Sequence, residues 1–236
     1  MTEEAMIDST LPPRRRTQSE RSEAMRLRLV EATLNCLESV GYAGTTVSRI
    51  VEAAQVSRGA PLHHFPTKAS LIEAAAEQLV RRIYILLGHT IRQVGESEDR
   101  LAEIIQSSWK AVFGTRENAV MLELMVASKH DAELASVMRK LWTAGYGTIG
   151  VAADHYFEPL SPDDNVRQLM VLTQWLLRGM AMDRHLIRDE HVFEHFLGLW
   201  SRVLASHMRA RPGVTQPPPR PAFWDSSLSD LPPDTV

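Results

Sequence analysis

One five-residue stretch near the end of the chain carries side chains that could hold a metal ion. His191-Val192-Phe193-Glu194-His195 matches an H-x-x-E-H pattern, which places two imidazoles on one helical face beside a carboxylate. A catalytic zinc needs a third protein ligand. Here His207 falls on the same predicted helix, and the later carboxylates fall in a proline-rich tail: Asp225, Asp230 and Asp234. A zinc-dependent hydrolase using His191, Glu194 and His195 is therefore an alternative, while we expect no enzyme, metal or cofactor.

A second group of residues, between positions 45 and 68, has the chemistry to contact a nucleic acid. Two short helices are predicted there, separated by Ala54-Gln55-Val56, with Val56 placed to pack beneath both. Ser57 begins the second helix, and the free N–H groups of a helix N-terminus attract phosphate. That helix combines polar and small side chains: Arg58, Gly59, Ala60, His63 and His64. The pattern indicates a helix-turn-helix whose second helix enters the major groove, and a generic helical corner is the alternative.

The elements that must position these residues are all predicted to be helices. Val30, Leu34 and Leu37 recur at helical spacing before a stop at Gly41, and Thr67 can cap a long helix that runs to about Val94. Punctuation by Gly, Pro, Ser and Asp predicts the remaining helices over residues 45–54, 57–64, 98–113, 115–128, 131–157, 164–187 and 190–208. Pro162 would take the first helical position after a Ser161 cap. Because no strand-like alternation interrupts this pattern, the predicted fold is all-α.

Charge is distributed unevenly along the 236 residues. The stretch from Pro12 to Lys68 holds nine Lys/Arg and five Asp/Glu, whereas the whole chain has a net charge of −3. A basic head on an acidic body suits a module that binds a polyanion. The chain has one cysteine, Cys36, no run long enough to span a bilayer and no signal-peptide pattern, so we expect a cytoplasmic protein.

The run around the helix pair resembles the signature of the TetR family of one-component regulators. The resemblance covers about residues 24–75 and rests on these positions: Gly41-Tyr42, Thr45-Thr46-Val47, Ile50, Ala53-Ala54, Val56-Ser57-Arg58-Gly59-Ala60, His63-His64-Phe65-Pro66-Thr67-Lys68 and Leu71. It implies a three-helix DNA-binding head at residues 21–68. It also implies an effector-binding and dimerisation body of about six helices at residues 69–210. The ends would be a disordered basic arm, residues 1–20, and a disordered proline-rich tail, residues 211–236.

The resemblance also implies roles for individual residues of the head. Thr45, Thr46 and Lys68 would bind phosphates. Arg58, Ala60, His63 and His64 would face the groove, with Arg58 making a bidentate contact to guanine. Ser57 and Gly59 would belong to the same DNA-binding surface, at the helix N-terminus that attracts phosphate. The Arg14–Arg16 run would contact the minor groove or the backbone, or remain solvated.

Three residues at two places in the head depart from the family pattern. Gln55 stands where the family has a turn glycine, so it must either adopt φ > 0 or remodel the turn. Pro61 and Leu62 replace a leucine-tyrosine pair, which predicts a distorted helix start and the loss of a hydroxyl contact to phosphate. A TetR-like chain that has lost DNA binding is therefore a further alternative.

The last two long helices carry more apolar surface than one contact between them would cover, which favours a homodimer built from about residues 162–208. Aromatic and methionine side chains of the body could line a cavity for a small apolar effector. These are Trp109, Phe113, Met121, Met125, Trp142, Tyr146, Met170 and Trp175, and the alternative is that they fill the core. The predicted mechanism is a ligand-released repressor on a palindromic operator, in which the long fourth helix moves when ligand binds.

Overall fold

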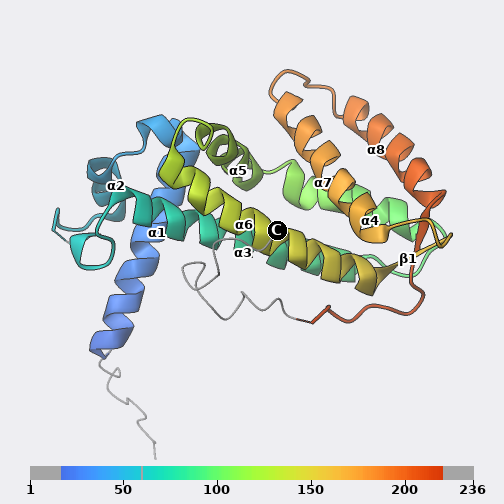
Figure 1. The fold of residues 1–236 in the computed structure, drawn as a ribbon. Helices are drawn as coiled ribbons and strands as arrows, with labels where there is room; N and C mark the ends of the chain where they lie inside the picture. The colour runs from blue at the N-terminus through green and yellow to red at the C-terminus, as the bar shows by residue number, and fades with distance from the viewer. Residues whose placement is uncertain (1–16, 60, 220–236) are drawn as a thin grey trace, which may run out of the picture.

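A computed structural model describes residues 17–59 and 61–219, without the side chain of Leu62. In Figure 1 a small head lies at one end of an elongated body, and α3 runs from one into the other. The head holds α1 (Gln18–Gly44), α2 (Val47–Ala54) and a 3₁₀ turn (Pro61–His63). The body holds α3 (Lys68–Gln93), α4 (Arg100–Ser108), a π-helical turn (Trp109–Phe113), α5 (Arg116–Ala127), α6 (Ala132–Tyr156), α7 (Val166–Asp183) and α8 (Glu190–Ala205). The predicted six-helix body is confirmed.

Most helices of the described chain begin at a side-chain cap, and α4 is an exception. The Thr17 hydroxyl accepts a hydrogen bond from the Glu20 N–H, and the Glu20 carboxylate accepts one from the Thr17 N–H, which fixes the start of α1. Thr67 caps α3 in the predicted place. The predicted stop at Gly41 is a break inside α1, since Gly41 takes a φ of +72° and one more turn follows to Gly44.

The second helix of the predicted helix-turn-helix does not form as expected. Residues 57–59 lie in a turn and loop, and the only helical turn described between residues 57 and 64 is the 3₁₀ turn at Pro61–His63. With Ser57 as the cap, the N–H of residue 61 would make the first intrahelical bond, to the Ser57 carbonyl. Proline has no N–H, so Pro61 removes that bond. The His64 and Phe65 N–H groups instead donate to the Pro61 carbonyl, at 2.9 and 2.7 Å.

Other boundaries also differ from the sequence prediction, and the end of α7, at Asp183 instead of residue 187, is one of them. Helix α7 is capped by Asn165, whose side chain accepts from the Gln168 N–H, and Pro162 lies in the preceding turn. Helix α8 ends at Ala205, because Met208–Ala210 forms strand β2 and pairs antiparallel with β1 (Phe157–Pro159). The fold is mostly helical with one short two-stranded ribbon.

The described part of the tail is attached to the body. Buried Arg100 donates to the carbonyl oxygens of Arg211 and Val214, at 2.9 and 2.7 Å, and His155 contacts the Gln216 carbonyl at 2.8 Å. The expected disordered tail from residue 211 is therefore not seen as far as residue 219. Residues 220–236 and the Arg14–Arg16 run lie outside the described residues.

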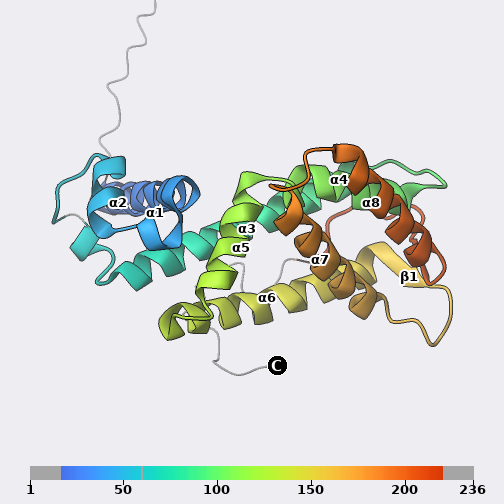
Figure 2. The same ribbon diagram turned by 90° about the horizontal axis from the view of Figure 1, so that it is seen from above.

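Two apolar clusters hold the molecule together. The first joins the head to α5 and α6 through residues such as Leu37, Leu71 and Leu124, each at most 1% exposed. The second joins α3, α4, α7 and α8 around Trp109 and Phe193. Figure 2 shows α5 crossing between α3 and α6 beside the head, and α7 and α8 side by side at the other end of the body. None of the described helices has the length and apolar character needed to cross a membrane.

Candidate nucleic-acid interface and interior cavity

Most of the residues predicted to contact DNA are exposed or half-buried on the head, and we call them together the tip; Thr45 is the exception. Thr46, Ser57, Arg58, Gly59 and His63 are exposed, His64 and Lys68 are half-buried, and Ala60 lies outside the described residues. Thr45 is fully buried, and its hydroxyl donates to the Gly41 carbonyl at 2.7 Å. Thr45 thus closes the end of α1 and does not reach the surface that its neighbour Thr46 shares.

We define residues 57–64 as the recognition segment. The sequence left two alternatives for the turn before it, a positive φ at Gln55 or a remodelled turn, and the structure has the first. Gln55 adopts φ +53° and ψ +48°, so a residue with a side chain takes the left-handed conformation that glycine favours. Val56 packs against the core of the head, as predicted. The turn therefore keeps its shape without glycine.

Cationic groups at this tip differ in how they are held. The Lys68 ammonium lies 4.6 Å from the centre of the Tyr42 ring and 3.5 Å from the Tyr42 carbonyl oxygen. Arg58 makes no hydrogen bond or ion pair within the described part of the chain. An exposed guanidinium of this kind is available for a base edge or a phosphate.

The body contains a cavity of about 450 Å³, partly open to the surface, between α3, α5, α6 and α7. Five of the predicted pocket residues line it: Phe113, Met121, Met125, Trp142 and Tyr146. Three do not. Trp109 is buried against Phe193, Met170 lines a separate pocket beside the tail, and Trp175 is half-exposed and stacks on Trp142 at 6.2 Å.

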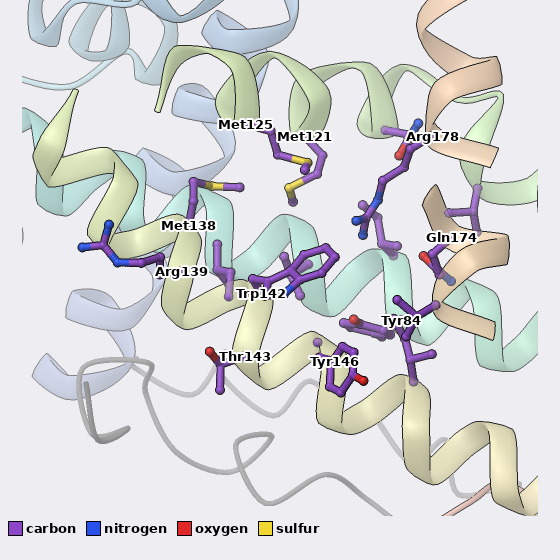
Figure 3. A pocket seen from close by; sticks show the side chains of 18 of the residues that line it. Tyr84, Met121, Met125, Met138, Arg139, Trp142, Thr143, Tyr146, Gln174 and Arg178 are labelled. Atoms are coloured by element: carbon purple, nitrogen blue, oxygen red, sulfur yellow. The ribbon is translucent and has the colours of Figure 1, made fainter. Parts of the chain in front are cut away.

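Polar side chains that were not predicted also reach this cavity. Tyr84, Gln174 and Arg178 line it, and the Arg178 Cζ lies 5.4 Å from the centre of the Trp142 ring. The Arg178 Nη1 is buried and has no hydrogen-bond partner. Figure 3 shows the Arg178 guanidinium directed toward Trp142 and Tyr84, with the methionines around the other side of the space.

Burial changes the titration of two of these groups. It raises the pKa of Tyr84 to about 12, and the positive charge of Arg178 opposes that rise. It lowers the pKa of Arg178 from its ordinary value, and Tyr84 opposes that shift. Tyr84 is therefore neutral near pH 7, while arginine, with an unperturbed pKa above 12, keeps its charge.

Helix α5 connects the cavity to the head. Met121 and Met125 face the cavity, whereas Glu123, on the opposite side of the helix, accepts a hydrogen bond from the Tyr42 N–H. The Tyr42 hydroxyl donates to Asp131, the cap of α6. Burial and this bond raise the pKa of Tyr42 to about 12, while the Leu134 N–H and the Tyr42 hydroxyl lower the pKa of Asp131.

Among the residues that the structure describes, the H-x-x-E-H stretch is not part of a metal centre. His191 and His195 are exposed, and the His191 Nδ1 lies 3.0 Å from Glu194 Oε2. Within the described ranges no three His, Cys, Asp or Glu side chains come together to hold an ion. The predicted hydrolase alternative is left without a third ligand from the described residues.

Known proteins resemble this chain over most of its length. The sequence model for bacterial regulatory proteins of the tetR family matches residues 29–75. The HTH-type transcriptional regulator CymR of Pseudomonas putida is 30% identical over 189 residues, which are 78% of this chain and 91% of CymR.

Solved structures share the fold. A transcriptional regulator from Rhodococcus superposes with a TM-score of 0.60 at 24% identity, covering 77% of this chain and 97% of its own. A regulator from Saccharomonospora viridis, in complex with choline, superposes at 0.59 with 16% identity, covering 80% and 99%. With a head that the tetR-family model matches, a six-helix body and a relative matched over 91% of its own length, this chain belongs to the TetR family of transcriptional regulators, which are not enzymes.

Proposed function

We propose that this regulator is a repressor that binds a palindromic operator as a homodimer and is released when a small molecule occupies the cavity. In this proposal residues 21–68 bind DNA, residues 69–210 hold the effector and dimerise, and the protein acts on DNA in the cytoplasm. The observation that carries the proposal is that α5 touches the head with Glu123 and the cavity with Met121 and Met125. An occupant that displaces α5 therefore acts on the head directly.

The proposed DNA contacts come from the exposed tip. Arg58 would read a guanine through its two-pronged guanidinium, while Thr46, Ser57 and Lys68 would bind phosphates. His63, His64, Gly59 and Ala60 complete the surface that we assign to the groove. Thr45 is left out of this set because its hydroxyl is buried and already bonded.

A dimer is supported by an apolar surface on the two last helices. Leu172, Trp175 and Leu176 on α7 are exposed at helical spacing, and Trp175 is 52% exposed. Phe196, Leu199 and Val203 form a matching stripe on α8, where Phe196 is 50% exposed. Stripes of this size on adjacent helices favour a second copy packing on them as a four-helix interface.

Release is supported by the continuity of α3 and α5 between cavity and head. Lys68, at the N-terminal end of α3, packs on Tyr42 of the head, and Tyr84, four turns on, lines the cavity. The choline complex is a property of the Saccharomonospora protein, and it supports a small-molecule role for the cavity of this fold. A ligand that prefers one arrangement of α3 and α5 would shift the population of DNA-binding dimers.

Selection of bound duplexes from a random pool tests the proposal. We expect recovery of one inverted repeat with half-sites about one helical turn apart, bound by two protomers. Recovery of no preferred sequence would contradict it and would favour the TetR-like chain without DNA binding. That second candidate is favoured by one observation, the absence of a regular helix from the described part of the recognition segment.

A further inference from the structure

We propose that the effector of this cavity is an amphipathic carboxylate, whose anionic group binds Arg178 and whose apolar body lies among the methionines and aromatic rings. This inference rests on the proposed role of the cavity as the effector site. The sequence alone predicts a small apolar effector, and this inference adds an anionic group to it.

The Arg178 guanidinium carries a buried hydrogen-bond donor without a partner in the described chain. Arg178 Nη1 is buried without a hydrogen-bond partner among the described residues, and the Arg178 guanidinium lies over the face of the Trp142 ring. A buried cationic N–H without an acceptor is costly, so native proteins rarely keep one without a use. A carboxylate accepts two parallel hydrogen bonds from a guanidinium and matches this fork in both charge and shape.

The described side chains that line the cavity carry positive charge and no negative charge. The described cavity lining contains two arginines, Arg139 and Arg178, and neither Asp nor Glu. Arg139 is exposed, and Figure 3 shows its guanidinium pointing away from the space, so Arg178 provides the charge inside. With no carboxylate in the lining, the cavity favours an anion over a cation.

Two neutral hydrogen-bond donors, Gln174 and Tyr84, line the cavity together with Arg178. Gln174 is buried one helical turn before Arg178 on α7, and Tyr84 lies on α3 facing them. A methyl group at Gly145 would overlap the Tyr84 hydroxyl, so the glycine makes the room that this hydroxyl occupies. Because Tyr84 stays protonated at neutral pH, it can donate to the same anion.

The rest of the lining defines the body of the ligand. Met121, Met125 and Met138 are flexible and polarisable, and Phe113 and Trp142 offer flat apolar faces. A cavity of about 450 Å³ accommodates a body of small-molecule size. The polar end formed by Tyr84, Gln174 and Arg178 and this apolar remainder together specify an amphipathic ligand with one anionic end.

Isothermal titration calorimetry without DNA tests the inference with matched probes. Octanoate, octanamide and octylammonium share one chain length and differ in head-group charge, and 4-phenylbutyrate with its amide and amine repeats the comparison on an aromatic body. We expect each carboxylate to bind roughly 10- to 100-fold tighter than its amide, the range of a charge-assisted hydrogen bond. Equal binding by carboxylate and amide, tighter binding by the amine, or no carboxylate binding up to the solubility limit would overturn it.

Variants of the arginine locate the effect. Arg178→Met should abolish the preference for carboxylate over amide, and Arg178→Lys should keep part of it, since lysine keeps the charge but not the planar fork. Arg139→Met is the matched control and should keep the preference. Loss of the preference in Arg139→Met but not in Arg178→Met would contradict the assignment.

Thermal unfolding separates ligand binding from a structural role. If Arg178 serves the ligand, the unliganded Arg178→Met protein should melt at the same temperature as the wild type or higher, because an unpaired buried charge is removed. A large fall in melting temperature would assign Arg178 to folding instead. Carboxylate binding that leaves operator affinity unchanged would refute ligand release alone, whereas release by amides as readily as by carboxylates would refute this inference alone.

Discussion

Two arginines, one at each functional region, show how differently the head and the body use an unpaired charge. Arg58 is exposed at the tip of the head, and Arg178 reaches into the cavity; neither forms an ion pair within the described chain. Water solvates Arg58, so leaving it unpaired costs little free energy and does not by itself indicate a ligand. Arg178 has lost that solvation at Nη1, so its isolation requires a reason. The surface site is therefore identified by sequence pattern, and the interior site by unsatisfied geometry.

The largest effect should come from separating the two heads. Trp175→Glu combined with Phe196→Glu places charges on the proposed dimer surface, and we expect monomers whose operator affinity is roughly 100-fold lower or worse, because linked half-site binding is lost. Light scattering gives the oligomeric state and fluorescence anisotropy the affinity. Ile85→Glu changes an equally exposed apolar residue on α3 and should leave both unchanged. A double variant that stays dimeric would place the interface elsewhere.

Removing the exposed arginine should have the next largest effect. Arg58→Ala should cost about 1–3 kcal/mol of binding to the selected operator, the range of a bidentate base contact. Binding to unrelated DNA should fall much less, and the ratio of the two affinities is the measurement. Arg209→Ala, on β2 at the far end of the body, serves as the control. Equal losses on both DNAs would reduce Arg58 to a phosphate contact.

Adjacent threonines sharpen the comparison between buried and exposed groups. Thr45→Val removes the hydrogen bond to the Gly41 carbonyl and should lower the free energy of unfolding by about 0.5–1.5 kcal/mol in urea titration. Operator affinity of the folded protein should stay the same. Thr46→Ala removes the cap of α2 and should lower both stability and affinity. An affinity loss confined to Thr45→Val would reverse our assignment.

The smallest effect concerns pH and the contact between head and body. Tyr42 and Tyr84 have pKa values raised to about 12, so the folded state holds their protons more tightly than the unfolded state. Their contribution to stability is complete below pH 10 and is lost as pH rises from 10 to 12. Tyr42→Phe should flatten this alkaline decline measured by denaturation. Asp131 has the opposite sign: its lowered pKa means that its contribution is lost in acid.

Sequence reasoning served the head better than the body because local chemistry specifies local structure. The Thr67 cap and the packing of Val56 follow from residue type and spacing, whereas the left-handed Gln55 is one of two alternatives raised by the departure from the family pattern. Pro61 predicts a distorted helix start. Its full consequence follows only when the hydrogen bond it removes is identified as the first one of the helix, to the Ser57 carbonyl. Three-residue strands such as β1 are too short to leave a periodic signal.

The cavity was only partly predictable because composition does not tell which way a side chain faces. Phe113 lines the cavity while nearby Trp109 packs on Phe193. Arg178 did leave a signal, as the only charged residue between Leu169 and Met182 in an apolar helix. A charged residue in such a helix either faces solvent or serves a function, and whether its side chain is buried distinguishes the two. That distinction needs the positions of α3, α5 and α6 around it.

The most direct test of the central claim, that the exposed tip of the head binds duplex DNA specifically, is a salt titration of affinity for the selected operator and a scrambled duplex. We predict that both affinities fall steeply between about 50 and 200 mM salt, as expected when phosphate contacts release counterions. We also predict that the operator remains preferred in the wild type and that Arg58→Ala narrows this preference. Affinities that do not change with salt, or equal affinities for both duplexes, would contradict the account.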